Sequence, residues 1–426
     1  MSRERNRRIL FISGVGLGQR GAQLLSTLIT LPLVLHALGV AGFGLWGAAT
    51  SMGWLSGMLD LGLGSALLTL LPERLAAGQG GTLHRYITAS LLAGCGMMVL
   101  ALAGGGAIIW AGGLHLALPL LVACIALAVN IPLNISRDIW FGLQKGQIAG
   151  YWDFIQTLLT LLLLVAAAWR GAGVTAMTAA VYAAMLTANA ASLAHVLIRH
   201  PELRAKWGAL GDALTAILGR GSMMFAITIA GSCGYSFDTL LALHWLGPDA
   251  SAQMVVAQRV CTTAIGFLNI ISLPLWPAFV EAVTLDDRAW LRRSLRNGTL
   301  FLTVLAMAGS LCIVAVGAPV LRLWLHRDMH IGPVLLWAMA GWIIILTLPR
   351  VSGLLLNAAM ALRAQLAIMV AVAILGFVLK YFAARMFGVA GILATTPALW
   401  LIMAVPAYFW LARRRIDARK PMAATE

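Results

Sequence analysis

Long apolar segments separated by short polar connections run through the whole sequence. A helix that crosses the hydrocarbon core of a membrane needs about 20 mostly apolar residues. Twelve segments meet this requirement: residues 9–36, 43–71, 86–111, 114–141, 151–170, 172–198, 215–246, 250–281, 299–325, 331–361, 363–384 and 388–412. The pattern predicts an all-α polytopic membrane protein with twelve transmembrane helices, in which the shortest connections join neighbouring helices as antiparallel hairpins.

The composition agrees with this pattern and excludes several classes of protein. Of the 426 residues, 61% are hydrophobic and only 11% are charged, whereas about a quarter of the residues in a soluble domain are charged. A compact soluble fold of this size has too few polar residues here to cover its surface. Soluble enzymes, nucleic-acid-binding proteins and disordered proteins are therefore excluded.

The basic residues predict the orientation of the chain. With a cytoplasmic N-terminus, 23 of the 30 Lys and Arg residues lie in inner segments and 5 in outer segments, Lys380 among them; Arg20 and Arg259 lie within spans. The positive-inside rule then places both termini in the cytoplasm. The first apolar segment, 9–36, is too long for a signal peptide and contains Arg20, so we expect an uncleaved first helix.

A short internal repeat divides the chain into two halves. Leu35–Gly39 reads LHALG and Leu243–Gly247 reads LHWLG, an offset of 208 residues that aligns the first helix with the seventh. Six spans per half give parallel repeats related by an axis along the membrane normal. The predicted organisation is an N-terminal six-helix bundle (1–199), a cytoplasmic linker (200–214), a C-terminal six-helix bundle (215–412) and a basic cytoplasmic tail (413–426). Two such bundles around a central cavity are typical of alternating-access transporters.

The sequence shows no pattern typical of an enzyme or a metal site. The five cysteines are scattered through apolar segments without a CxxC pair, so neither a zinc site nor a disulfide framework is expected. The spans lack carboxylates or histidines at paired spacing, and we find no phosphate-binding loop or HExxH motif. We therefore expect a protein that is not an enzyme and has no cofactor, with H⁺ or Na⁺ as candidate coupling ions.

Two arginines near the middle of their spans are candidates for binding substrate. A charge at bilayer depth costs at least about 2.5–3.5 kcal/mol, so such residues tend to be functional. Arg20 lies in the first span and Arg259 in the eighth, one in each half. Guanidinium groups bind phosphate oxygens bidentately, so two of them facing one cavity would hold a pyrophosphate. The alternative is that each arginine pairs with a carboxylate or with helix-end carbonyls and only stabilises its bundle.

Two acidic residues within spans are the matching candidates for ion coupling. Asp60 in the second span is placed to neutralise Arg20, and Asp238 in the seventh to neutralise Arg259. A carboxylate that exchanges between an arginine and a proton or Na⁺ would couple ion flow to the rocking of the bundles. A fixed buried ion pair is the alternative interpretation.

Four segments carry a resemblance to a known family. They read LPLVLHALGVAGFGLW (31–46), LDLGLGSA (59–66), AQRV (257–260) and LPLWPAFVEA (273–282). In these segments and in its span number the chain resembles the Wzx-type O-antigen and exopolysaccharide flippases. That family belongs to the MOP superfamily, which also contains the MATE-type drug exporters and the peptidoglycan lipid flippase.

The resemblance implies a flippase of surface polysaccharide biosynthesis in the bacterial inner membrane. Such a protein moves a polyprenyl-pyrophosphate-linked oligosaccharide from the cytoplasmic to the outer leaflet, and here Arg20 and Arg259 would hold the pyrophosphate. Its partners would be that glycolipid, membrane lipids and other polysaccharide-assembly membrane proteins, with no nucleic acid. One alternative is a MATE-type cation-coupled exporter of small organic cations, although such cations prefer an acidic cavity. Another is a non-transporting membrane scaffold for glycan assembly.

Overall fold

The computed structural model is built from α-helices joined by short connections, and the described part contains no β-strand. It describes residues 2–417 apart from 54–61, 77–79, 113–116, 144, 205–209, 218–234, 273–274, 276–278, 280–281, 284–285, 327–330 and 359–361.

The chain divides into two compact units, residues Met1–Thr228 and Ile229–Glu426. Segment 200–214, predicted to be a linker, groups with the first unit, and its first residues form the short helix η3 (Pro201–Leu203). The predicted limits of the two bundles, their arrangement around a central cavity and the basic tail stay predictions.

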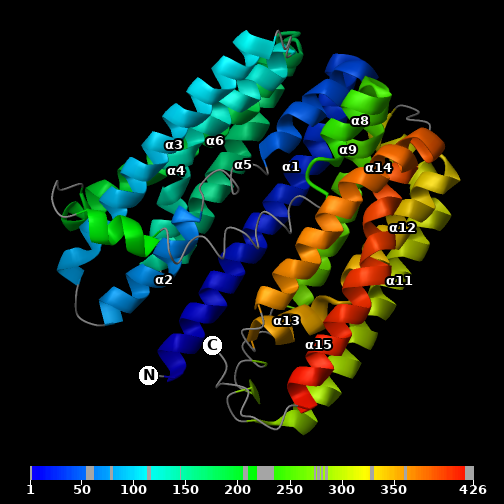
Figure 1. The fold of residues 1–426 in the computed structure, drawn as a ribbon. Helices are drawn as coiled ribbons and strands as arrows, with labels where there is room; N and C mark the ends of the chain where they lie inside the picture. Colours follow the sequence, from blue (N-terminus) through cyan, green and yellow to red (C-terminus); the bar gives the residue numbers. More distant parts are fainter. Residues whose placement is uncertain are drawn as a thin grey trace. The chain divides into compact units, whose positions relative to one another are not determined.

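The first unit is organised around helix α4, which is its most buried span. Its helices are α1 (Ser2–Ser51), α2 (Leu63–Ala76), η2 (Gly80–Thr82), α3 (Leu83–Gly112), α4 (Leu118–Gly142), α5 (Gly146–Trp169) and α6 (Val174–Arg199). Figure 1 shows α3, α4, α5 and α6 running side by side, and α4 packs against α2, α3, α5 and α6. Helix α1 packs against α5 and α6. Because all of α4's neighbours cover it, side chains such as Ile139 and Trp140 are buried.

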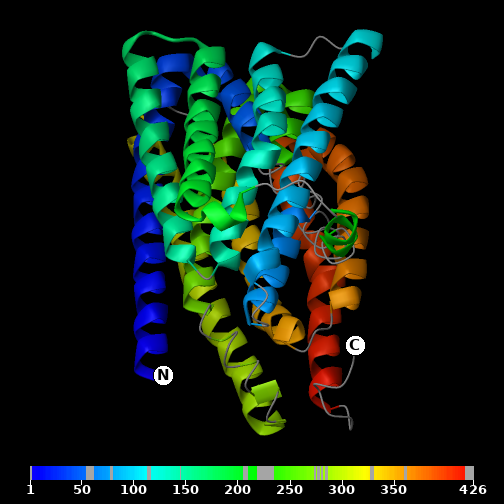
Figure 2. The same ribbon diagram turned by 90° about the vertical axis from the view of Figure 1, so that its left-hand side faces the viewer.

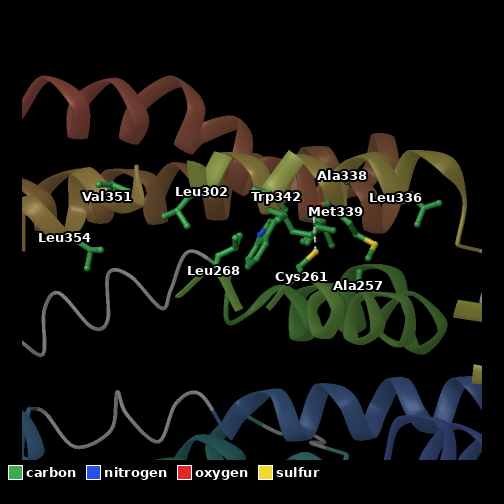
Figure 3. Packing of buried hydrophobic residues seen from close by; sticks show 14 of the residues in the cluster. Ala257, Cys261, Leu268, Leu302, Leu336, Ala338, Met339, Trp342, Val351 and Leu354 are labelled. Atoms are coloured by element: carbon green, nitrogen blue, oxygen red, sulfur yellow. Dashed lines mark hydrogen bonds between the residues drawn. The ribbon is translucent and has the colours of Figure 1, made fainter. Parts of the chain in front are cut away.

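The second unit contains the larger apolar core. Its helices are α8 (Asp238–Leu246), α9 (Pro248–Ser272), α11 (Arg288–Leu325), α12 (Pro333–Thr347), α13 (Arg350–Ala358), α14 (Leu362–Leu399), the π-helical turn η4 (Trp400–Ala404) and α15 (Val405–Asp417). Figure 3 shows α9 packing against α12: Ala257 and Cys261 face Met339 and Trp342, and the Cys261 thiol lies 3.8 Å from the Met339 carbonyl oxygen. Small side chains on α9 allow this close approach.

Three glycines turn the chain from one helix into the next without a loop. Gly39 (φ 70°, ψ 177°) interrupts α1, Gly247 (φ 93°, ψ −179°) separates α8 from α9, and Gly388 (φ 58°, ψ −138°) interrupts α14. Residues with a side chain rarely adopt this backbone conformation. The repeat read from the sequence is thus also a structural one, because LHALG and LHWLG both end in the same glycine corner.

Eight helices of the described part are long and apolar enough to cross a membrane. Two of these helices, Gly21–Ser51 and Arg363–Asp417, contain a glycine corner. Parts of the predicted second, seventh and eighth spans lie outside the described residues. The chain is therefore a multi-pass membrane protein, and the number of twelve spans stays a prediction. Figure 2, turned by 90°, shows α3 as one long continuous rod.

Candidate functional site

A buried ion pair lies where α8, α9 and α14 of the second unit meet (Figure 1). The Lys380 ammonium donates to Asp238 Oδ1 at 2.5 Å, and the two side chains are 3% and 1% exposed. Asp238 begins α8, where the positive end of the helix dipole favours a carboxylate. Because α8 ends nine residues later at Gly247, the pair lies about 13 Å along the helix from that corner. Asp238 belongs to the predicted seventh span, 215–246, and Lys380 to the predicted eleventh, 363–384.

Polar side chains of α8 and α9 form a hydrogen-bonded network beside this pair. The Gln258 amide donates to the Tyr235 carbonyl oxygen at 3.0 Å and accepts from the Thr239 hydroxyl at 2.8 Å. The Ser251 hydroxyl donates to the Thr239 carbonyl oxygen at 3.3 Å. These hydrogen bonds fix how α9 is rotated relative to α8. They therefore also fix the direction of the side chain of residue 259, which follows Gln258.

That residue is Arg259, the second of the predicted substrate-binding arginines. It lies 12 residues after the Gly247 corner, about 18 Å along α9 at the rise of an α-helix. Its side chain is exposed, and its guanidinium makes no hydrogen bond or ion pair with any residue that the structure describes. The predicted pairing of Arg259 with Asp238 is wrong, because the carboxylate faces α14 and is taken by Lys380.

The structure places Lys380 elsewhere than the orientation pattern predicts. That pattern assigns Lys380 to an outer segment, yet it lies in the middle of α14 and is 2% exposed. One signal was present in the sequence, since Lys380 falls inside the predicted eleventh span, 363–384. A lone lysine in an apolar segment requires a buried carboxylate as its partner, but the sequence does not specify which one.

The other two predicted site residues lie partly or wholly outside the described residues. Arg20 lies in the helical backbone of α1, but its side chain is outside the described residues, as is Asp60 altogether. Their proposed pairing stays a prediction. In the described part of the chain, no group of three or more His, Cys, Asp and Glu residues is placed to hold a metal ion.

The first unit has a polar cluster of a different kind at the end of α6. His200 Nε2 lies 2.9 Å from the Lys145 ammonium, and Nδ1 lies 2.8 Å from Glu202 Oε1. Because Lys145 is a donor only, Nε2 accepts and Nδ1–H donates to the carboxylate. This hydrogen bond, together with the positive charge of Lys145, holds the pKa of Glu202 below its usual range. The cluster ties segment 200–204 to the connection between α4 and α5.

Sequence comparisons do not place the chain in a family. No protein-family model matches it, and no curated protein matches it in sequence.

Comparison with solved structures does identify the fold. A multidrug-resistance MATE family transporter of the MOP superfamily, solved in an inward-facing conformation, superimposes with a TM-score of 0.78 at 14% identity, covering 95% of this chain and 98% of that one. A MOP superfamily transporter from Pyrococcus furiosus gives 0.67 at 14% identity (98% and 96% covered). A mutant of the Vibrio cholerae MATE transporter VcmN gives 0.63 at 13% identity (98% of both chains). The chain therefore has the fold of MATE transporters of the MOP superfamily.

Proposed function

We propose that this protein is an alternating-access flippase that moves a polyprenyl-pyrophosphate-linked oligosaccharide from the cytoplasmic to the outer leaflet of the bacterial inner membrane. It carries out transport, not catalysis. The observation that carries the proposal is the charge pattern of the second unit. Arg259, in the predicted eighth span, is exposed, while the Asp238 carboxylate of the predicted seventh span is bound to Lys380.

This pattern favours an anionic substrate. A cavity for organic cations needs a carboxylate whose charge is available, but Asp238 is buried and bound to Lys380. The Arg259 residue is exposed, and its guanidinium carries the forked donors that phosphate oxygens accept. Arg20 is the proposed counterpart in the first unit, and Asp60 remains the candidate for ion coupling there.

The fold supports the alternating-access part of the proposal. Structures with this fold have been solved in inward-facing and outward-facing conformations. The Pyrococcus furiosus transporter is described as having a binding pocket of reverse polarity that suggests a different function. The same fold thus accommodates pockets of more than one polarity, and a cationic pocket in this chain fits within that range.

A MATE-type exporter of small organic cations is the second candidate, and the fold likeness favours it equally. In that case Asp238 would take up a coupling proton or Na⁺ in exchange for Lys380. A non-transporting scaffold for glycan assembly is the third, and it has no requirement for an arginine at membrane depth.

Mass spectrometry of lipid extracts tests the proposal. Cells that lack the gene, and cells that carry Arg20→Ala with Arg259→Ala, should accumulate one polyprenyl-pyrophosphate oligosaccharide that wild-type cells do not. Arg259→Lys keeps the positive charge but removes the planar guanidinium that binds two phosphate oxygens at once. Cells with this variant should therefore accumulate an intermediate amount of the lipid-linked oligosaccharide. Arg170→Ala removes an exposed cation from the turn after α5 and should leave the lipid profile unchanged.

An unchanged lipid profile in the null strain would refute the flippase. Accumulation of a fluorescent organic cation in that strain would then establish the exporter. Normal transport of both kinds of substrate, with loss of surface glycan, would instead favour the scaffold.

A further inference from the structure

A basic pocket opens between the beginning of α11 and the end of α15, both in the second unit. Its volume is about 710 Å³, and its wall includes Arg292, Arg293, Arg296 and Arg413. α15 lies beside the first turns of α11 (Figure 1). This pocket is separate from the ion pair of Asp238 and from Arg259, neither of which lines it.

The positive charge of the pocket is only partly neutralised by the protein. Arg292 is bound to Asp417 at 2.5 Å, and Arg296 donates to the Asn297 side chain at 3.4 Å. The guanidinium groups of Arg293 and Arg413 make no hydrogen bond or ion pair with any described residue. The pocket wall thus contains four guanidinium groups and one carboxylate. Its excess positive charge would be balanced by an anion with more than one negative charge.

Two hydroxyl groups in the pocket wall also lack a partner. The Oγ1 atoms of Thr299 and Thr303 are buried, and neither makes a hydrogen bond. Most threonines within helices bond to the carbonyl four residues earlier, as Thr347 does in this unit. A buried polar group without a partner is unfavourable. The wall of the pocket thus contains two hydroxyl groups that a bound ligand would satisfy.

The apolar surface next to the pocket indicates that the ligand is a lipid. Leu300 lines the pocket and is exposed, and Phe301 and Val304 continue this exposed apolar surface along α11. Beside the pocket, Trp410 is exposed and Arg414 lies over its ring at 5.1 Å. Exposed tryptophans with neighbouring arginines are typical of the membrane–water interface. A headgroup at the level of the arginines would thus have its acyl chains along α11.

We propose that this pocket binds the phosphate headgroup of an anionic membrane lipid. Arg293 and Arg413 bind the phosphate oxygens, the two threonine hydroxyls complete the site, and Leu300 contacts the first acyl carbons. Basic pockets between transmembrane helices bind such headgroups in other membrane proteins. A bound lipid would join α11 to α15. This inference does not depend on which substrate the protein transports.

Native mass spectrometry of the purified full-length protein tests the site. The protein in detergent is titrated with cardiolipin, phosphatidylglycerol or phosphatidylcholine, and separately with inorganic phosphate and pyrophosphate. The first cardiolipin or phosphatidylglycerol should bind at least about tenfold more tightly than phosphatidylcholine. Arg293→Ala with Arg413→Ala should weaken it by about tenfold or more, because both guanidinium groups lose their charge-assisted hydrogen bonds to the phosphate.

Two further variants keep the result interpretable. Arg85→Ala with Arg199→Ala removes two exposed arginines from the first unit and should leave lipid affinity within twofold of wild type. Thr299→Val with Thr303→Val keeps all charges and nearly the same shape, and should weaken binding several-fold. Wild-type affinity in both the arginine and the threonine variants would overturn the proposal. Binding of pyrophosphate as tight as that of lipid would also overturn it and assign the pocket to a free anion.

Discussion

The buried ion pair between Asp238 and Lys380 yields the sharpest prediction about stability. Lys380→Met removes the charge but keeps a long flexible side chain, and Asp238→Asn keeps the shape of the carboxylate. Each single substitution leaves its partner buried and charged without a counterion. The double variant replaces both charges and leaves neither.

The magnitude follows from the distance and the burial. At an effective dielectric constant of about 20, unit charges separated by the observed 2.5 Å attract each other by about 7 kcal/mol. Desolvation of both groups offsets most of this attraction in the intact pair. Breaking such a pair from one side costs about 3–5 kcal/mol, whereas replacing both members is often close to neutral. We expect each single variant to lose about 3–5 kcal/mol and the double variant clearly less than their sum.

Thermal unfolding in detergent at a fixed scan rate measures these differences. At about 2–4 °C per kcal/mol for a unit of this size, each single variant should unfold about 6–20 °C below wild type. Arg385→Met, an exposed cation stacked on Tyr381 in the same helix, is the control and should shift the midpoint only slightly. Single variants that unfold at the wild-type temperature would refute this reasoning, as would a double variant that loses the full sum.

Two further predictions concern the glycine corners and the polar cluster after α6. Gly247→Ala places a side chain in a backbone conformation that nearly requires glycine, at a cost of about 1–3 kcal/mol, and because no atom would contact the new Cβ this cost is purely conformational. Gly266 lies within α9, and an added Cβ there would also contact no atom. Gly266→Ala should therefore not destabilise the protein. Equal decreases in the unfolding temperatures of the two variants would contradict a conformational cost at Gly247. The Glu202 carboxyl should titrate below its usual range in ¹³C NMR of glutamate-labelled protein, so its hydrogen bond with His200 is present at neutral pH and is lost as the pH falls through that lowered pKa. His200→Ala should raise the pKa of Glu202 towards its usual range. An unchanged pKa would show that the hydrogen bond with His200 does not cause the lowered value.

The elements that could be predicted are those whose cause is local in the sequence. A long apolar segment predicts a span. The repeated LHxLG pattern predicts that the first and seventh helices are equivalent, and both patterns end in a glycine corner, at Gly39 and Gly247. Pro349 is a further local signal, because a proline inside a span predicts a kink. It lies between α12 and α13, where one predicted span, 331–361, is two helices. Proline removes a backbone hydrogen bond, so the break has a local cause as well.

The partners of charged side chains could not be predicted, because they depend on how each helix is rotated. Asp238 and Arg259 lie on consecutive helices, yet the rotation of α8 turns the carboxylate towards Lys380 of α14, 142 residues away in sequence. The pocket at α11 and α15 has the same origin, since Arg293 and Arg413 approach each other only in the folded unit. Span assignment alone leaves this rotation open.

The glycine corners have a practical consequence for anyone who labels this protein. At Gly39, Gly247 and Gly388 the next helix begins with the following residue, so no free stretch of backbone exists there. An epitope tag, a protease site or a fused reporter inserted at these points would have to force two packed helices apart. Biochemical mapping of this protein should instead use the turn 170–173 between α5 and α6, where Arg170, Gly171 and Gly173 are exposed.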